Sequence, residues 1–334
     1  MIDSLRQGWN AVRRNWGLVL LLLLPNLLLA RLMAGPLRET LERDLRNKGA
    51  SVSMMNGFDY DWWKAWSEDQ KGWTGSFGPD ILGTGFAFKN VDQLLKGAFP
   101  LRLFHVEGPS PSPEERDDRP PTLDGVILGV AFVYWLVQLF LTGGVLGVVR
   151  SPSGGWTVRG LLHGSGFYFG RILRVSLIAL LAAGVLFLLN RPLASWAEGQ
   201  AREAVSEATA LAWLLGRHAL LLLAILFVHA VSSFAKVAIV VEERSSAVLA
   251  FLTSLGFTLG NLRRVAGQYL VVGLASVIGL ALWAAFDARF VTTGYKTQLV
   301  TLVVFQAVII FRIALRLVLL AAQICLYRAR PARG

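Results

Sequence analysis

The chain has 334 residues, of which 54% are hydrophobic and only 16% are charged, and its mean hydropathy is +0.52. Soluble domains carry about 25% charged residues, whereas several apolar runs here approach or exceed the ~20 residues that a helix needs to cross a bilayer. Composition therefore excludes an ordinary soluble protein and predicts an all-α polytopic membrane protein.

The net charge of +11 is unevenly distributed along the chain. Residues 35–124 hold 11 Lys and Arg against 15 Asp and Glu, and the rest of the chain holds 22 against 7. The basic excess lies mainly beside or within apolar runs, where basic residues at span ends are retained on the cytoplasmic side and attract anionic lipid. No basic cluster with interleaved aromatic residues lies outside these runs. The charge therefore predicts a lipid bilayer as the partner and argues against a nucleic acid.

The N-terminal part combines a basic lead at 1–15 with an apolar run, Trp16–Met33, that contains Pro25. The run is long for a signal peptide and lacks a clean small-x-small cleavage site. We therefore expect an uncleaved first span that Pro25 kinks.

Residues 35–124 differ in kind, because they are polar, mixed in charge and rich in tryptophan. We expect helices at 36–47 and 79–96, followed by a flexible Pro-rich linker at 108–121. This insert is expected to be a small domain or a cap that lies on the membrane.

The remainder alternates apolar runs with short polar segments, which predicts five more spans. We expect these spans at 125–149, 173–189, 211–241, 265–286 and 298–327. Amphipathic segments at 158–172 and 248–262 precede the third and fifth spans, and a polar connection at 190–210 follows the third.

Lys and Arg in the short loops predict the orientation. One set of span ends carries most of them, namely Arg6, Arg13, Arg14, Arg150, Arg159, Arg171, Arg174, Lys236, Arg244, Arg263, Arg264, Arg328, Arg330 and Arg333. We therefore expect a bacterial inner-membrane protein with both termini in the cytoplasm and the insert outside it. The expected division is 1–34 for the lead and first span, 35–124 for the insert and 125–334 for a five-span bundle.

Two segments at an offset of 90 residues resemble each other, VRGLLHGSGFYFGRILRV at 158–175 and VLAFLTSLGFTLGNLRRV at 248–265. The Gly-Phe pair at 166–167 matches the one at 256–257 without a gap. Each segment has an apolar face, which is typical of a helix on the inner leaflet that then turns into a span. We predict a repeated hairpin with an inner-leaflet amphipathic helix, with a weaker third copy near Gly8. The alternative is that any two amphipathic helices beside a membrane look alike.

Ionisable side chains inside spans are the default functional candidates. On the fourth span, His218, His229 and Lys236 fall within about 20° of one line at about 100° per residue. On the sixth span, Arg312 and Arg316 share a face by the same geometry. Two long helices are therefore expected to carry polar stripes.

The stripes leave two interpretations open. They line a hydrated path or binding cavity, or they face the bundle interior and hydrogen-bond across it, with Lys236 and Arg316 reaching toward the inner interface. A buried arginine needs a partner, and we expect Glu242 or Glu243, at the inner end of the fourth span, to supply it.

The stretch FDYDWWKAW at 58–66 is a candidate contact patch, formed by Asp59, Asp61, Trp62, Trp63 and Trp66. Tryptophans near a bilayer usually belong to an aromatic belt, but they also form the core of a cap or stack on a ligand or partner protein. Paired carboxylates act as general acid and base in glycosidases, although a pair two residues apart does not by itself indicate catalysis.

The sequence contains no nucleophile elbow, P-loop or dinucleotide fingerprint. Cys325 is the only cysteine, and the four histidines lack the spacing of a metal site. We therefore expect no catalytic, cofactor-binding or metal-binding residues, which favours a non-enzymatic role while leaving the question open.

The stretch VVEERSSAVLAFLTSLGFTLGNLRRV, residues 240–265, has a Val-x-Glu elbow followed by Ala250, Ser254 and Gly260–Asn261 at fixed spacing. It resembles bacterial six-span proteins related to the membrane domain attached to glycerophosphodiester phosphodiesterases, although Phe257 stands where that pattern has leucine. We find no room for the phosphodiesterase domain in these residues. The resemblance therefore implies the six-span architecture and no enzymatic activity.

The principal hypothesis is a non-enzymatic membrane component that handles lipids or partner membrane and envelope proteins. It rests on the expected inner-leaflet helices, the basic inner face and the Trp-rich insert. The alternative is a transporter or permease for a small solute or lipid that uses the polar stripes of the fourth and sixth spans.

Overall fold

A computed structural model describes residues 2–46, 52, 59–69, 125–151, 156–289 and 295–329, and every regular element in these ranges is an α-helix. The helices there are α1 (Ile2–Arg14), α2 (Trp16–Leu45), α4 (Tyr60–Asp69), α7 (Gly125–Arg150), α8 (Val158–Glu203), α9 (Glu207–Glu242), α10 (Ala247–Gly260), α11 (Leu262–Asp287) and α12 (Tyr295–Arg328). The predicted all-α class is confirmed for these residues. The linker at 108–121 and the helix expected at 79–96 lie outside them.

Six of these helices, α2, α7, α8, α9, α11 and α12, are long and apolar enough to cross a membrane. Large apolar side chains cover their outer surfaces, and Leu180, Leu223 and Leu282 each expose 63–68% of their area. Contiguous apolar surface of this kind is unfavourable in water and favourable in lipid. Within the described residues, length and composition therefore support a multi-pass membrane protein with six candidate spans, as the sequence predicts.

The structure forms two compact units that are built from discontinuous segments. The first unit comprises Met1–Leu21, Val137–Ser276 and Arg312–Gly334, and the second comprises Leu22–Leu136 and Val277–Phe311. The division of the chain into consecutive domains at residues 34 and 124 stays a prediction.

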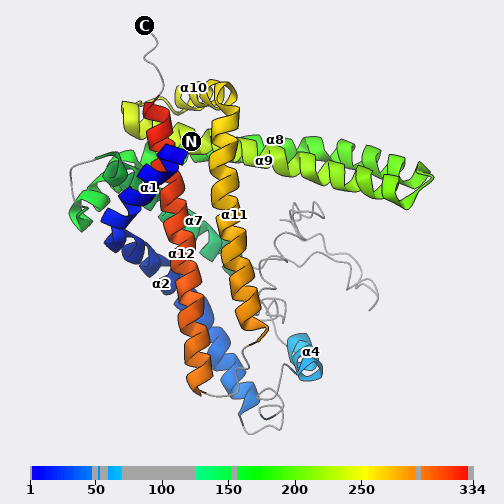
Figure 1. Cartoon of the computed structure of the whole chain (residues 1–334). Coiled ribbons are helices and arrows are strands. Elements are labelled where there is room, and N and C mark those ends of the chain that lie inside the picture. Colours follow the sequence, from blue (N-terminus) through cyan, green and yellow to red (C-terminus); the bar gives the residue numbers. More distant parts are fainter. Residues whose placement is uncertain are drawn as a thin grey trace. The chain divides into compact units, whose positions relative to one another are not determined.

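In the first unit, α8 and α9 run side by side as a long hairpin, and α10 packs near the end of α9 (Figure 1). Only residues 204–206 separate the two long helices. Ser206 is the N-cap of α9, and its side chain accepts a hydrogen bond from the amide of Thr209. The 46 residues of α8 extend about 69 Å, more than twice the ~30 Å hydrocarbon core of a bilayer. An upright span therefore accounts for only part of this helix.

Two sets of elements that were predicted as separate are continuous helices. The first span and the helix expected at 36–47 are joined in α2, which runs through Pro25 and Pro36. Side chains near these prolines add hydrogen bonds to helix carbonyls, as Asn26 Nδ2 does to the Leu22 oxygen at 2.9 Å, and such contacts make proline tolerable in a span. Similarly, α8 joins the amphipathic segment at 158–172, the third span and most of the polar connection.

The two copies of the predicted repeat differ in structure at one pair of matching positions, Arg171 and Asn261. In the second copy Asn261, with φ −125°, separates α10 from α11, and its Nδ2 donates to the Phe257 carbonyl at 3.1 Å. Arg171 stands at the matching position of the first copy, where the helix continues. Asparagine competes for backbone hydrogen bonds, whereas arginine is a good helix former. The predicted turn from a short helix into a span is therefore present in the second copy and absent from the first.

In the second unit, aromatic side chains join the helices. Trp66 of α4 is 6% exposed, and its Nε1 donates to Asp44 Oδ2 of α2 at 2.9 Å. The Tyr134 hydroxyl of α7 donates to Asn26 Oδ1 of α2 at the same distance. The ring of Trp283, on α11, lies 5.3 Å from that of Phe305 on α12, measured between centroids.

Close contact between α7 and α8 depends on glycine. A Cβ added at Gly144 would overlap the Leu161 carbonyl oxygen and Ser165 Oγ, and a Cβ at Gly164 would lie 3.3 Å from the Gly144 Cα. Small residues let helix backbones approach closely, which favours helix association in a membrane.

We expect Gly144→Ala to lower the free energy of unfolding by about 1–3 kcal/mol, because the new methyl group meets backbone that must shift. Thermal unfolding of the full chain in mild detergent measures this loss. Gly129→Ala on the same helix is the matched control, since a Cβ there meets nothing within 4 Å. Equal effects of the two substitutions would contradict the close crossing.

Candidate functional site

The elbow between α9 and α10 is held by arginines from two other helices. Glu243 caps α9 with φ 55°, a left-handed conformation that residues other than glycine rarely adopt. Arg150 Nη1, at the end of α7, donates to the Glu243 carboxylate at 2.8 Å and to the Val240 carbonyl at 2.7 Å. Arg171 of α8 donates to the Glu243 carbonyl at 3.2 Å. These bonds satisfy carbonyls that the end of a helix leaves open.

The end of α12 reaches the same elbow. The buried Tyr327 donates its hydroxyl to Glu242 Oε1 at 2.8 Å, and Arg328 donates to the Arg150 carbonyl at 3.0 Å. Arg244 forms an ion pair with Glu242. We call these contacts, together with those of Glu243, the elbow junction. It brings the ends of α7, α9 and α12 together with Arg171 of α8.

The prediction that Glu242 or Glu243 pairs with the sixth-span arginines is wrong. Both glutamates are engaged in the elbow junction, and Arg316 instead donates to Gln138 Oε1 at 2.5 Å and Thr142 Oγ1 at 3.3 Å. Arg316 lies twelve residues before Arg328, which is about 18 Å along α12. The arginine is therefore too far from the end of the helix to meet the elbow.

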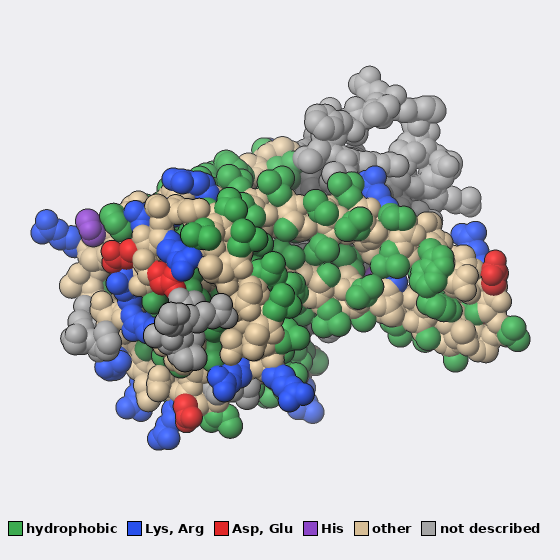
Figure 2. All heavy atoms as spheres, turned by 90° about the horizontal axis from the view of Figure 1, so that it is seen from above, with side chains coloured by type: hydrophobic (Ala, Val, Ile, Leu, Met, Phe, Trp, Pro, Cys, Tyr) green, Lys and Arg blue, Asp and Glu red, His purple; other side chains and the backbone are tan. Residues whose placement is uncertain are grey.

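Lys and Arg side chains gather on the face that carries α10, whereas hydrophobic side chains follow the α8–α9 hairpin (Figure 2). The first unit exposes arginines from α1, α8 and α11, namely Arg13, Arg14, Arg159, Arg174, Arg263 and Arg264. We call the surface around α10 on which the basic side chains gather the basic face (Figure 2). Clustered cations of this kind attract anionic surfaces.

The polar stripes of the fourth and sixth spans meet inside the first unit. Ser233 Oγ of α9 donates to Gln323 Oε1 of α12 at 2.7 Å, and Gln323 Nε2 donates to the Tyr269 hydroxyl of α11 at 3.1 Å. The His229 ring packs edge-on against Tyr269, with 5.9 Å between centroids. Gln323 therefore forms hydrogen bonds across the bundle interior, to α9 and to α11.

Electrostatic interactions connect three basic side chains of this unit. The charge of Arg316 acts on Lys236 of α9, and both charges act on His229. We call His229, Lys236 and Arg316 the cationic cluster. Lys236 forms neither a hydrogen bond nor an ion pair with any residue in the part of the chain that the structure describes. Arg312, one turn from Arg316, is exposed.

His218 is not part of this cluster. It lies eleven residues before His229, about 16 Å along α9. Its ring contacts the Leu214 carbonyl and Arg217, each at 2.7 Å, and Arg217 pairs with Glu198 of α8 at 3.1 Å. These contacts tie the two arms of the hairpin together, so the predicted fourth-span stripe is divided between two places.

The tryptophan patch on α4 consists largely of packing and capping contacts. Asp59 Oδ1 accepts a hydrogen bond from the Trp62 amide at 3.0 Å, as a helix N-cap does. The Trp62 ring stacks on Trp66 with 5.8 Å between centroids, and Trp63 lies 5.1 Å from Tyr60. Asp61 is exposed, and Trp62 and Trp63 remain partly exposed. The described contacts thus give Asp59 and Trp66 structural roles.

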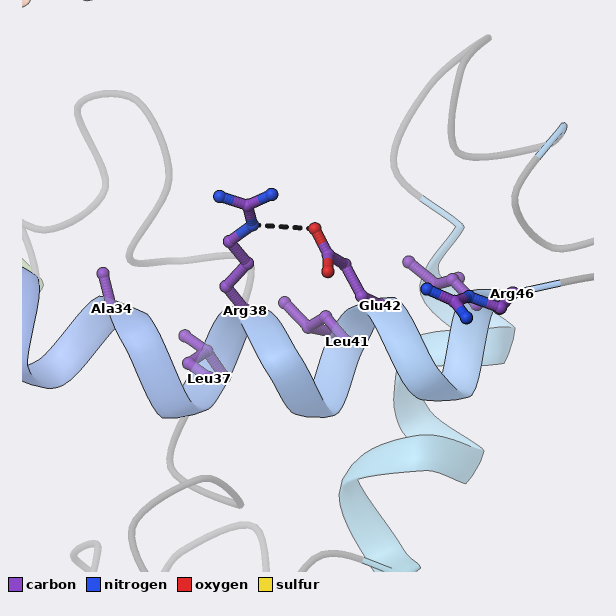
Figure 3. Close-up of a pocket in the computed structure, with 7 residues that line it drawn as sticks. Ala34, Leu37, Arg38, Leu41, Glu42 and Arg46 are labelled. Atoms are coloured by element: carbon purple, nitrogen blue, oxygen red, sulfur yellow. Dashed lines mark hydrogen bonds and ion pairs between the residues drawn. The ribbon is translucent and has the colours of Figure 1, made fainter.

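A shallow groove lies on the second half of α2, where the Arg38 and Glu42 side chains point the same way and form an ion pair at 2.7 Å (Figure 3). Six residues of α2 and Arg46, which follows the end of the helix, line it, the six being Ala34, Leu37, Arg38, Leu41, Glu42 and Leu45. An exposed ion pair four residues apart contributes only about 0.3–0.5 kcal/mol. The described lining of the groove is mostly apolar and forms no arrangement that would support catalysis.

Two glutamines, the buried Gln268 and the half-buried Gln138, were missed because the sequence was searched for ionisable groups. Gln268 of α11 is fully buried, and its Nε2 donates to Ser4 Oγ of α1 at 3.0 Å and to the Ala322 carbonyl of α12 at 3.2 Å. Gln138 of α7 accepts from Arg316. The sequence signal for such residues is an uncharged amide side chain inside an apolar run. Because buried polar groups need hydrogen-bond partners, such an amide indicates a contact with another helix.

Among the described residues, no group of three or more His, Cys, Asp and Glu side chains is arranged to hold a metal ion. Comparison of the chain with family models, curated proteins and solved structures found no match. The function is therefore inferred from the contacts themselves.

We expect Arg150→Gln to lower the free energy of unfolding by about 1–3 kcal/mol, because the Val240 carbonyl and the Glu243 carboxylate lose a charged donor. The Val240 bond should contribute the larger share, since the Glu243 side chain is 60% exposed and exposed ion pairs contribute little. Thermal unfolding of the full chain in mild detergent measures the change.

Arg159→Gln is the control for this experiment. It removes the same charge from an exposed arginine to which the structure gives no described partner. We expect a change within about 0.5 kcal/mol. If both variants lose the same stability, the effect belongs to net charge and the elbow junction is not the cause.

Proposed function

We propose that this protein is a non-enzymatic integral membrane component that handles lipids at the face bearing the elbow junction. The exposed face of α10 carries this proposal. Val248, Leu252 and Leu259 each expose 56–60% of their area, while Ala250 and Ser254 on the opposite side are fully buried against the protein. The helix contains no charged residue. Its outward apolar face therefore has the character of a surface that contacts acyl chains.

The basic face lies beside this helix. Arg263 and Arg264 follow α10 directly in the chain, and both are exposed. An apolar helix flanked by cations suits the boundary between acyl chains and anionic headgroups. Because Lys and Arg at span ends are retained in the cytoplasm, we place α10 and both termini on the cytoplasmic side of a bacterial inner membrane.

The repeat supports the same arrangement. In the proposed duplication, the first copy contributes the exposed Arg159 and Arg174, and the second contributes the exposed Arg264 and α10. The resemblance of residues 240–265 to the membrane domain attached to glycerophosphodiester phosphodiesterases supports the six-span architecture. No enzymatic activity is proposed from it.

The proposal predicts that anionic lipid is enriched about two-fold or more around the protein. The full chain is extracted from membranes in polymer-bounded nanodiscs, and the lipid composition of the discs is compared with that of the bulk membrane. A triple variant, Val248→Ser, Leu252→Ser and Leu259→Ser, should lose the enrichment, because none of the three side chains is buried in the protein. Val248→Leu, Leu252→Ile and Leu259→Ile, which keep the face apolar, should retain it.

Two results would contradict the lipid role. One is a lipid shell of bulk composition around the wild-type protein, and the other is enrichment that survives the triple serine variant. If a second protein is instead recovered in stoichiometric amount and is lost with Trp62→Ala and Trp63→Ala, the function is to bind a partner.

A transporter or permease is the second candidate, favoured by the polar side chains of α9, α11 and α12 that meet in the interior. In this case His229→Ala combined with Arg316→Ala should abolish flux in proteoliposomes, measured as phosphate uptake and as transbilayer movement of a fluorescent lipid. His218→Ala, on the distant part of α9, is the matched control. Unchanged flux in the double variant would exclude this candidate.

A further inference from the structure

Two arginines from different helices converge on one residue of the elbow junction. Arg150 Nη1, at the end of α7, lies 2.8 Å from Oε1 of the Glu243 carboxylate. Arg171 Nη1, on α8, lies 3.2 Å from the Glu243 carbonyl oxygen. Two guanidinium groups therefore meet at the residue that ends α9, and each of them comes from a separate helix.

Each guanidinium group is also held by a contact other than Glu243. Arg150 Nη1 donates to the Val240 carbonyl at 2.7 Å and to the Tyr168 hydroxyl at 3.4 Å. The Arg171 guanidinium carbon lies over the Phe167 ring, 4.9 Å from its centroid, where the π electrons attract a cation. Side chains that are already held in place lose less freedom when they bind a ligand. The two arginines are therefore preorganised.

The two positive charges share one carboxylate. Among the described residues, Glu243 supplies the carboxylate that contacts Arg150, whereas Arg171 contacts its carbonyl. The Glu243 side chain is 60% exposed, and an exposed ion pair contributes little. Nε and Nη2 of both arginines have no hydrogen-bond partner in the part of the chain that the structure describes. The pair thus has charge and N–H donors left for a second anion.

The donors and the neighbouring surface match a phospholipid headgroup. A planar guanidinium presents paired N–H groups that fit the oxygens of a phosphate group. Phe167, directly beside Arg171, exposes 53% of its area. A free inorganic anion would have no use for this apolar ring, whereas a lipid carries its phosphate next to apolar chains. The combination therefore favours a phosphate group that is attached to a lipid.

We propose that Arg150 and Arg171 bind the phosphate group of an anionic phospholipid, and that the Glu243 carboxylate competes with this phosphate for Arg150. The lipid displaces the carboxylate, while the Val240 carbonyl keeps its bond to Arg150. This proposal deepens the proposed function and rests on it, because it names the lipid group that is recognised. Its residues differ from those on the exposed face of α10, so the two can be tested separately.

The test uses the full chain, purified in mild detergent and stripped of lipid. Phosphatidylglycerol and phosphatidylcholine are titrated separately, and bound lipid is counted by native mass spectrometry. We expect saturable binding of phosphatidylglycerol and binding of phosphatidylcholine that is at least several-fold weaker, because the choline cation is repelled by the arginines. Arg171→Gln should weaken phosphatidylglycerol binding about tenfold, since it removes charged donors to the phosphate.

Glu243→Gln should change binding in the opposite direction. It removes the competing carboxylate, so phosphatidylglycerol should bind about threefold more tightly, a modest gain because an exposed ion pair is weak. A purely structural role for the elbow junction predicts no gain. This variant also decides the question if Arg171→Gln fails to fold.

Arg191→Gln is the matched control. It makes the same substitution at an exposed arginine of the same helix, twenty residues and about 30 Å along α8 from Arg171. We expect its binding to equal that of the wild type. Inorganic phosphate at the concentration of the lipid should leave phosphatidylglycerol bound, because it lacks an apolar part. Displacement under these conditions would show that the ligand is phosphate and not a lipid.

The proposal is overturned if the two lipids bind equally, if Arg191→Gln weakens binding as much as Arg171→Gln, or if Glu243→Gln fails to tighten it. Failure of the proposed function gives a different result. A lipid shell that stays enriched around a protein without the saturable site contradicts this proposal alone, whereas saturable binding inside a shell of bulk composition contradicts the role of α10 alone.

Discussion

The first unit depends on how α9 ends. The last carbonyls of a helix have no partner within it, and near a membrane core such groups cannot be left to water. Arg150 supplies the missing donor from α7, and Glu243 turns the chain through a left-handed residue so that its carboxylate meets the same guanidinium. The direction in which α10 leaves α9 follows from that turn.

The aromatic packing beneath the elbow junction follows from the same constraint. Because α10 folds back beside α9, the Phe257 ring lies 5.1 Å from both Phe234 and Tyr327, measured between centroids. The Tyr327 hydroxyl then reaches Glu242. This packing leaves the other side of α10 apolar and exposed next to the basic face. The surface of α10 that is proposed to contact lipid is thus a consequence of one turn.

The six apolar helices of the described residues could be predicted because they depend on the length of apolar runs, which is a property of the chain alone. The break before α11 was also expected, and Asn261 explains it. The continuity of α8 was not expected, because polar residues and Pro192 suggested a connection that the helix absorbs. The predicted partners of Glu242 and Glu243 were wrong because a helical wheel shows on which face of a helix a side chain lies. It does not show how far along the axis that side chain lies relative to neighbouring helices.

A double-mutant cycle between Arg150 and Glu243 tests the central claim most directly. Arg150→Gln, Glu243→Gln and the double variant are unfolded in the same mild detergent, and the interaction free energy is calculated from the three losses of stability. The elbow junction predicts a favourable coupling of about 0.5–1.5 kcal/mol, since the pair is in direct contact but partly exposed. Strictly additive losses would show that the two side chains act independently, and the elbow would then need another explanation.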